Sequence, residues 1–310
     1  MKHFYLSLMS ALTLALCAGN VVQAYAQADA PAKNDNVIYG VMNNATSTLT
    51  LYFDDMISER GGSDDWGFDF SDDTETIVLD VSMKNARPTI LDHWFEQFVN
   101  LTKIEHLDYL NTSEVTEVFG LFQQCTRLEK IDLSGLDLSH VTDPRYMFSE
   151  CESLKTLNLG NLCNNNIEYT EGMFNGCKKL KTLDLSRMNM KKVSNSSEMF
   201  KDCENLVTIY CNADLTESDE LEKSKDMFLH CYNLKGGRGT AYNNLHVDAA
   251  YARTDGGSSA PGYFTAKATG IEDIELEAKG DGQVRKILID GQIYIIRSGR
   301  MYSVQGAEVR

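Results

Sequence analysis

The apolar positions of this chain recur with a period of 26 residues, which lengthens to 28 before the last copy. In a complete copy, a cysteine is followed by apolar residues three, six and eight positions later. The five clearest copies begin at Leu121, Met147, Met173, Met199 and Met227. A degenerate copy begins at Trp94 and carries Phe98 at the cysteine position. Self-similarity at a fixed period of this size is typical of a solenoid of stacked repeats.

Each copy predicts a short helix followed by a short strand. Met147, Cys151 and Leu154 are spaced by four and three residues, which would place them on one face of a helix. Leu157 and Leu159 alternate with polar neighbours, as in a strand with one buried face. Stacked copies would set these strands side by side. The pattern therefore predicts an α/β fold, a solenoid with a parallel β-sheet.

Both ends of such an array need caps, because the terminal repeats would otherwise expose apolar surface. Before the array, β-forming runs predict strands at 37–41, 48–53 and 75–82. After it, short β runs separated by Asp-Gly, Ser-Gly and Gln-Gly predict a small meander. We therefore divide the chain into a signal peptide at 1–26, a β-rich N-terminal cap at 27–93, the solenoid at 94–240, an array-closing segment at 241–268 and a small C-terminal β tail at 269–310.

Five of the eight cysteines occupy one column of the repeat. Phe98 in the same column can neither bind a metal nor form a disulfide. The column therefore selects a buried apolar side chain, which a free cysteine supplies. A disulfide ladder and a soft-metal site are the alternatives. Cys163 lies in a different column, shared with Asp137 and Asn189, and is the candidate for an exposed or intermolecularly paired thiol.

The N-terminus has the features of a secretory signal. Lys2 precedes a mostly apolar stretch at 4–18, and the small residues at 24 and 26 predict cleavage near Ala26. No later apolar run is long enough for a transmembrane span. We therefore expect an exported protein, at the cell surface or secreted. Acylation at Cys17 is the lipoprotein alternative.

Charge and motifs exclude several classes of function. The formal net charge is −16, from 45 acidic and 29 basic residues, which excludes nucleic acid as a partner. The signatures of zinc proteases, serine hydrolases and P-loop proteins are absent, so we predict no enzymatic activity and no cofactor. The glycine-rich stretch at 236–239 lacks the helix that a phosphate loop requires. The acidic stretch at 64–73 lacks the alternating aspartates of a calcium loop and is interpreted as solvated, with calcium binding as the alternative.

The repeats resemble those of the BspA-like leucine-rich repeat surface proteins of bacteria. The units "LNTSEVTEVFGLFQQCTRLEKIDLS" and "LDLSHVTDPRYMFSECESLKTLNL" match several columns of that family's repeat, and the resemblance covers 94–235. Residues 236–267 are similar to the segment that closes such arrays. The ending "IYIIRSGRMYSVQGAEVR" is similar to the sorting tails of type IX-secreted proteins, with an ordinary β appendage as the alternative. The resemblance implies a leucine-rich repeat solenoid, anchoring at the bacterial outer surface, and adhesion.

We expect the function to be binding, as an adhesin that recognises an extracellular host or bacterial protein or a glycan. The alternative is a structural or assembly component of the cell envelope or of a surface fibre. Residues that flank the inward strand positions would form outward columns open to a ligand. These candidate binding residues are Lys130, Asp132, Thr156, Asn158, Thr182, Asp184, Thr208 and Tyr210. A face that is only solvated is the simpler interpretation.

Overall fold

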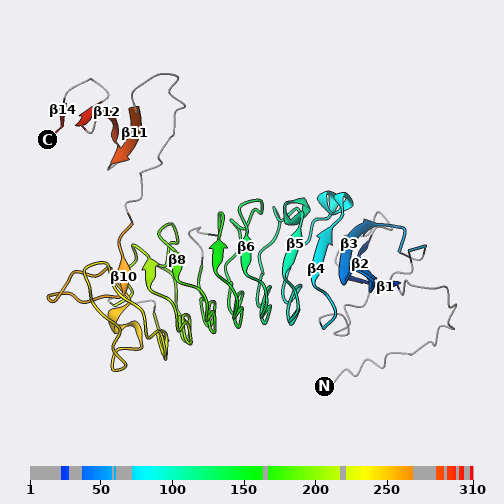
Figure 1. The fold of residues 1–310 in the computed structure, drawn as a ribbon, viewed down its shortest axis with the longest axis horizontal. Helices are drawn as coiled ribbons and strands as arrows, with labels where there is room; N and C mark the ends of the chain where they lie inside the picture. Colours follow the sequence, from blue (N-terminus) through cyan, green and yellow to red (C-terminus); the bar gives the residue numbers. More distant parts are fainter. Residues whose placement is uncertain are drawn as a thin grey trace.

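The repeats stack into an elongated array of coils (Figure 1). The computed structural model describes residues 22–27, 37–57, 59–60, 72–162, 167–216, 221–267, 284–289, 292–297, 300–303 and 308–309. A β-rich cap, drawn in blue, lies at one end of the array, and the closing segment, drawn in gold, lies at the other. One continuous apolar core runs from Ile38 in the cap to Phe264 in the closing segment.

The strands of the cap and the strand of the first coil form one five-stranded sheet. In spatial order, the strands of this sheet are β1 (Val22–Gln27), β2 (Val37–Asn43), β3 (Thr48–Asp54), β4 (Thr76–Leu79) and, from the first coil, β5 (Lys103–Glu105). The first three pair antiparallel, and the last two continue the sheet in parallel. The strands predicted at 37–41 and 48–53 are therefore confirmed as β2 and β3.

The third predicted strand is shorter than expected. β4 ends at Leu79, and a 3-10 helix, η2 (Val81–Asn85), follows it. The turn begins at Asp80, whose carboxylate accepts a hydrogen bond from the Ser82 N–H at 2.9 Å, as an N-cap residue does. At the start of the sheet, β1 spans the predicted cleavage position at Ala26, and the rest of the predicted signal peptide lies outside the described residues.

Each following coil contributes one short strand to a parallel ladder. These strands are β6 (Lys130–Asp132), β7 (Thr156–Asn158), β8 (Thr182–Asp184), β9 (Thr208–Tyr210) and β10 (Phe264–Thr265). β6 pairs with β7, and β8 pairs with β9, which in turn pairs with β10. A second row of parallel bridges joins the coils elsewhere, for example Glu117 to Asp143 and Tyr169 to Asn195. The predicted parallel solenoid is therefore present.

The prediction of a short helix in each repeat is wrong. The residue before each column cysteine has a positive φ of 58° to 73°, in the left-handed region; these residues are Gln124, Glu150, Gly176, Asp202 and His230. The residue four positions earlier also has a positive φ, as at Gly120 and Tyr146. A right-handed helix cannot include a left-handed residue in every turn. The segment is therefore a series of tight turns.

Hydrogen bonding explains why these turns replace a helix. The N–H groups of Gly120, Phe122 and Gln124 donate to carbonyl groups of the next coil at 2.8 to 2.9 Å, whereas a helix would use them internally. Helical structure in the described residues is limited to short 3-10 segments such as η3 (Leu107–Tyr109) and η4 (Ala249–Tyr251). The fold is thus a β-solenoid, and the predicted α/β leucine-rich repeat class is corrected.

A ladder of aromatic rings fills the centre of the array. It consists of Phe95, Phe122, Phe148, Phe174, Phe200 and Phe228, all buried. Neighbouring rings are stacked with centroids 5.4 to 5.8 Å apart. Tyr263 ends the ladder by packing its edge against Phe228 at 5.1 Å. Each coil therefore buries its rings only through its neighbours, as in other repeat proteins.

The column cysteines are buried free thiols, as the sequence predicts. Each thiol donates to a phenylalanine carbonyl of the preceding coil; the Sγ–O distance is 3.1 Å from Cys151 to Phe122 and 3.0 Å from Cys203 to Phe174. Burial raises the pKa of both thiols to about 12. The column therefore packs and donates hydrogen bonds, and it holds no disulfide in the described chain.

The C-terminal tail contains the predicted meander. Its strands are β11 (Val284–Ile289), β12 (Gln292–Arg297), β13 (Arg300–Ser303) and β14 (Glu308–Val309). They pair antiparallel in sequence order. A role of this tail in sorting stays a prediction.

Candidate binding face

The eight predicted binding residues lie on the outward side of strands β6 to β9. In β6 and β8 the central residue is buried and both flanking residues are exposed. β7 differs slightly, because its central Leu157 is only partly buried. In β9 the flanking Thr208 and Tyr210 are partly buried as well. The structure thus brings the predicted residues together as columns on one face, which we call the sheet face.

Carboxylate and amide groups at the ends of these strands hold the following turns. Asp132 Oδ1 accepts hydrogen bonds from the Ser134 N–H at 3.1 Å and from its hydroxyl at 2.7 Å. These bonds, the hydroxyl first, lower the pKa of Asp132. The Asn158 side chain also donates to Asp132 at 3.0 Å, which links the two coils. Asp132 therefore fixes both the turn that follows β6 and the side chain of Asn158 on the next coil.

One end of the sheet face is covered by the chain itself. The ammonium group of Lys267, from the array-closing segment, pairs with Asp184. It also lies 5.6 Å from the centre of the Tyr210 ring, a cation–π contact. The side-chain amide of Asn212 holds the Lys267 backbone at 3.0 and 3.1 Å. Two predicted binding residues, Asp184 and Tyr210, are therefore already engaged.

The electrostatics of Asp184 agree with this contact. Partial burial alone would raise the pKa of its carboxyl group. The hydrogen bond from Lys267 and those from Ser186 outweigh that effect and lower the pKa. Sequence reasoning missed Lys267, since it lies 83 residues from Asp184 in a segment without a repeat pattern.

The strand ladder is interrupted twice, and a cleft opens at each interruption. The separate sheets end at β5, at β7 and at β10, so no ladder pairing joins β5 to β6 or β7 to β8 in the described chain. The cleft between β7 and β8 measures about 330 Å³ and includes Arg187 and Lys267 in its lining. The cleft between β5 and β6 measures about 300 Å³. Sequence reasoning did not predict either cleft.

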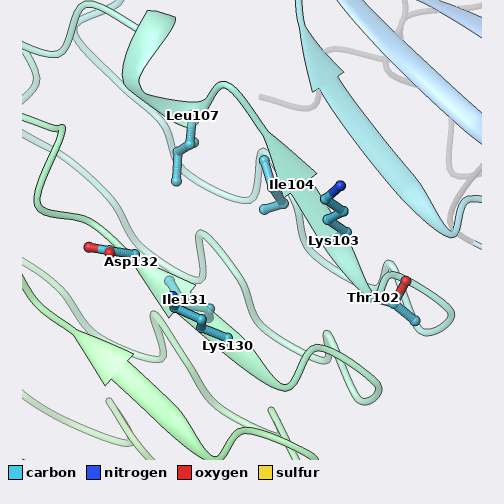
Figure 2. A pocket seen from close by; sticks show the side chains of 7 residues that line it. All are labelled: Thr102, Lys103, Ile104, Leu107, Lys130, Ile131 and Asp132. Carbon is cyan, nitrogen blue, oxygen red and sulfur yellow. The ribbon is translucent and has the colours of Figure 1, made fainter.

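The β5–β6 cleft combines an apolar floor with charged side chains. Its lining consists of Thr102, Lys103, Ile104, Leu107, Lys130, Ile131 and Asp132. Figure 2 shows Ile104 and Leu107 extending from the coil of β5 toward the strand that carries Ile131. Ile104 and Leu107 are half-buried, whereas Ile131 is buried. Two predicted binding residues, Lys130 and Asp132, thus belong to this cleft.

The glycine-rich stretch at 236–239 surrounds a carboxylate of the chain itself. Asp255 is 3% exposed and accepts hydrogen bonds from the N–H groups of Arg238, Thr240 and Gly257 at 2.8 to 3.0 Å, and from the Thr240 hydroxyl at 2.7 Å. A Cβ atom at Gly236 would lie 2.1 Å from the Gly262 carbonyl oxygen, which explains a glycine there. This loop therefore stabilises the closing segment.

Other candidates from the sequence remain unassigned. Cys163 and most of the acidic stretch at 64–73 lie outside the described residues. Within the described residues, no group of three or more histidine, cysteine, aspartate or glutamate side chains is arranged to hold a metal ion. No helix among those residues is long and apolar enough to span a bilayer.

Comparisons with known proteins identify the repeats but no activity. Residues 89–236 match the model of a family described as "Mycoplasma protein of unknown function, DUF285". No curated protein and no solved structure matches the chain. The repeat array is therefore similar to that family, whereas the resemblance to BspA-like leucine-rich repeat proteins is not confirmed.

Proposed function

We propose that this chain is an exported binding protein, an adhesin whose sheet face recognises an extended protein or glycan ligand. The observation that carries the proposal is the repetition of polar side chains at equivalent outward positions of successive coils, where paired strands such as β6 and β7 lie about 4.8 Å apart. A polymer presents hydrogen-bonding groups at regular intervals, and such a face can match several of them at once.

The open part of the face lies on β6, β7 and β8. Thr156 and Thr182 are exposed on adjacent coils, and their hydroxyl groups have no hydrogen-bond partner in the described chain. Each hydroxyl can donate one bond and accept others. Asn158 and Lys130 flank these positions. The covered end at Lys267 limits the usable surface to this central region.

Export supports a ligand outside the cell. The signal-like leader and the net charge of −16 agree with a secreted or surface-bound protein that binds proteins or neutral or cationic glycans. The similarity of the C-terminal tail to sorting tails agrees with anchoring at the outer surface.

The test is binding of the purified chain to arrays of glycans and of extracellular-matrix peptides. The sheet-face variant Thr156→Glu/Thr182→Glu should lose roughly tenfold or more in affinity for the ligand found, since each carboxylate blocks one repeat position. The matched control is Lys191→Gln/Lys192→Gln, which makes the same change in net charge at exposed positions away from the strands.

Two outcomes contradict the proposal. One is equal loss of binding in the control variant, which would place the ligand elsewhere or make the effect one of net charge. The other is absence of any ligand together with concentration-dependent self-association, which would favour a structural component of a surface fibre.

A further inference from the structure

We infer that the edge of strand β2, which opens when the signal peptide is removed near Ala26, pairs two copies of the mature chain into a two-fold dimer. The inference rests on the export proposed above, because cleavage after Ala26 leaves only Gln27 of strand β1. The inferred partner is a second copy of this chain, which is distinct from the ligand of the sheet face.

In the uncleaved chain, β1 covers the outer edge of β2. The two strands pair antiparallel over six residues, from Val22 opposite Asn43 to Gln27 opposite Ile38. On its other side, β2 pairs with β3. Loss of β1 therefore exposes a row of backbone N–H and C=O groups at the cap end of the array (Figure 1). The pairing with β1 also shows that this edge accepts an antiparallel strand.

The sequence of β2, VIYGVMN, lacks the features that keep exposed strand edges from pairing. Such edges usually carry charged residues or proline, whereas this strand of seven residues contains neither. Ile38 and Met42 belong to the main core. Tyr39 packs with Val41 on the opposite face. An uncharged strand that is apolar on both faces is therefore expected to be paired along both edges.

The strand is also self-complementary. Gly40 is its central residue, and pairing about a two-fold axis at Gly40 is antiparallel, as the pairing with β1 is. In this register, Ile38 lies opposite Met42 of the second copy, and Tyr39 lies opposite Val41. Opposite residues share one face of a sheet, so each apolar face of β2 would continue into the same face of its copy. Gly40 has no side chain that would crowd the axis.

The residues that follow the cleavage position do not match the composition of β1. Residues 28–36 contain Pro31 together with four aspartate or asparagine residues, and these residue types are depleted in strands. A second copy of β2 instead supplies an apolar strand of matching pattern. The second copy is therefore the favoured occupant of the open edge.

The symmetry of the pairing limits the assembly to two chains. A two-fold pair uses the same edge of both copies and is closed, unlike a fibre. The dimer would join two arrays at their cap ends and would carry two sheet faces. Two linked faces raise the avidity for a ligand with repeated binding groups.

The experiment compares the mature chain, residues 27–310, with a chain of residues 22–310 that retains β1. Analytical ultracentrifugation over a range of concentrations should show a monomer–dimer equilibrium for the mature chain and a monomer for the longer one. An excess of the peptide VQAYAQ, which has the sequence of β1, should dissociate the dimer. The same peptide with Tyr25→Pro should not, because proline interrupts the hydrogen bonds of a strand.

A pair of variants tests whether β2 is the interface. Val41→Lys places a charge on the edge strand and should weaken dimerisation of the mature chain roughly tenfold or more. The matched control is Thr50→Lys in β3, which lies opposite Val41 on the same face but away from the open edge. The peptide competition needs no substitution, so it decides the question if Val41→Lys fails to fold.

The inference is overturned if the mature chain stays monomeric, if the VQAYAQ peptide leaves the dimer intact, or if Thr50→Lys weakens dimerisation as much as Val41→Lys. Association beyond two chains would also overturn it and would favour a surface fibre. Mass spectrometry of the native chain should give a start near Gln27. A start at Cys17 would retain β1 and contradict the dimer while leaving export intact.

The dimer and the proposed adhesin fail in different ways. A monomeric mature chain whose binding to the arrays depends on Thr156 and Thr182 would contradict the dimer alone. A dimer without any ligand on the arrays would support the pairing of β2 and contradict the adhesin.

Discussion

The cysteine column shows how single side chains satisfy the backbone of this solenoid. The carbonyl of Phe148 accepts a hydrogen bond from the N–H of Cys151, in its own turn, at 3.2 Å. It accepts a second hydrogen bond from the thiol of Cys177, in the next coil, also at 3.2 Å. A buried carbonyl has two lone pairs, and both are used here. Phe98, at this position in the first coil, is also buried but has no side-chain donor. Cysteine therefore combines apolar packing with a weak donor.

These thiols should be unreactive while the chain is folded. Burial raises the pKa of Cys151 and Cys203 to about 12, so both are thiols rather than thiolates at pH 8, and burial also blocks access. Native iodoacetamide labelling followed by peptide mass spectrometry should leave both cysteines unmodified until denaturant unfolds the array. Cys163 serves as the internal comparison, because its column predicts an exposed thiol. Rapid native labelling of Cys151, or a recovered Cys151–Cys177 disulfide, would contradict the assignment.

At the scale of elements, the apolar spacing predicts which side chains face inward but not the backbone conformation. Met147, Cys151 and Leu154 are all buried, as the pattern requires. A helix and a series of tight turns satisfy the same spacing of four and three. The two conformations differ in the left-handed residue of each turn. Several of these residues, such as Glu150 and Asp202, are not glycine, so their positive φ could not be predicted from residue type. Gly176 within one predicted helix, and Gly120 and Gly172 directly before two of them, were the available hint.

The candidate site was likewise predictable only in part. Alternation along β6 and β8 is local, so the outward columns could be predicted from the repeat. The contact of Lys267 with Asp184 and the interruption between β5 and β6 depend on tertiary structure. No periodic signal in the sequence reports either feature, because neither recurs in every repeat.

The closing element depends on one ionised carboxylate. Burial alone would raise the pKa of Asp255, but the Thr240 hydroxyl and the surrounding N–H groups outweigh it and lower the pKa to about 2. A lowered pKa stabilises the folded state above the ordinary value near 3.8, and the contribution is lost as pH falls toward 2. It amounts to about 2 kcal/mol at neutral pH.

Asp255→Asn should therefore destabilise the chain by roughly 1–3 kcal/mol at pH 6, because the amide nitrogen cannot accept the N–H groups that the carboxylate accepts. The difference in the free energy of unfolding between wild type and variant should become smaller as pH falls from 4 to 2. Urea unfolding at several pH values measures both effects. Asp214→Asn, at an exposed turn, is the control. If the difference in the free energy of unfolding stays constant with pH, the hydrogen bonds to Asp255 do not depend on its ionised carboxylate.

For the whole molecule, the stacked geometry means that each coil is stabilised mainly by its two neighbours. Among the described residues, the phenylalanine ladder and the backbone hydrogen bonds between coils join adjacent coils. Such arrays behave as a chain of coupled units rather than as a single sphere-like core. The β-rich cap and the closing segment then protect the ends, where a coil would otherwise have one neighbour.

A destabilising substitution in the middle of the array should therefore lower the stability of the neighbouring coils only. Leu183 is 1% exposed in the central strand β8, and Leu183→Ala should cost about 2–5 kcal/mol. Leu157→Ala, at a partly buried position in β7, should cost less. Hydrogen exchange followed by mass spectrometry should show faster exchange in the coils around β8, with strands β2 to β4 of the cap unchanged. Equal acceleration along the whole chain would instead mean that the solenoid and its cap unfold as one cooperative unit, in which the coupling between coils exceeds the stability of any single coil.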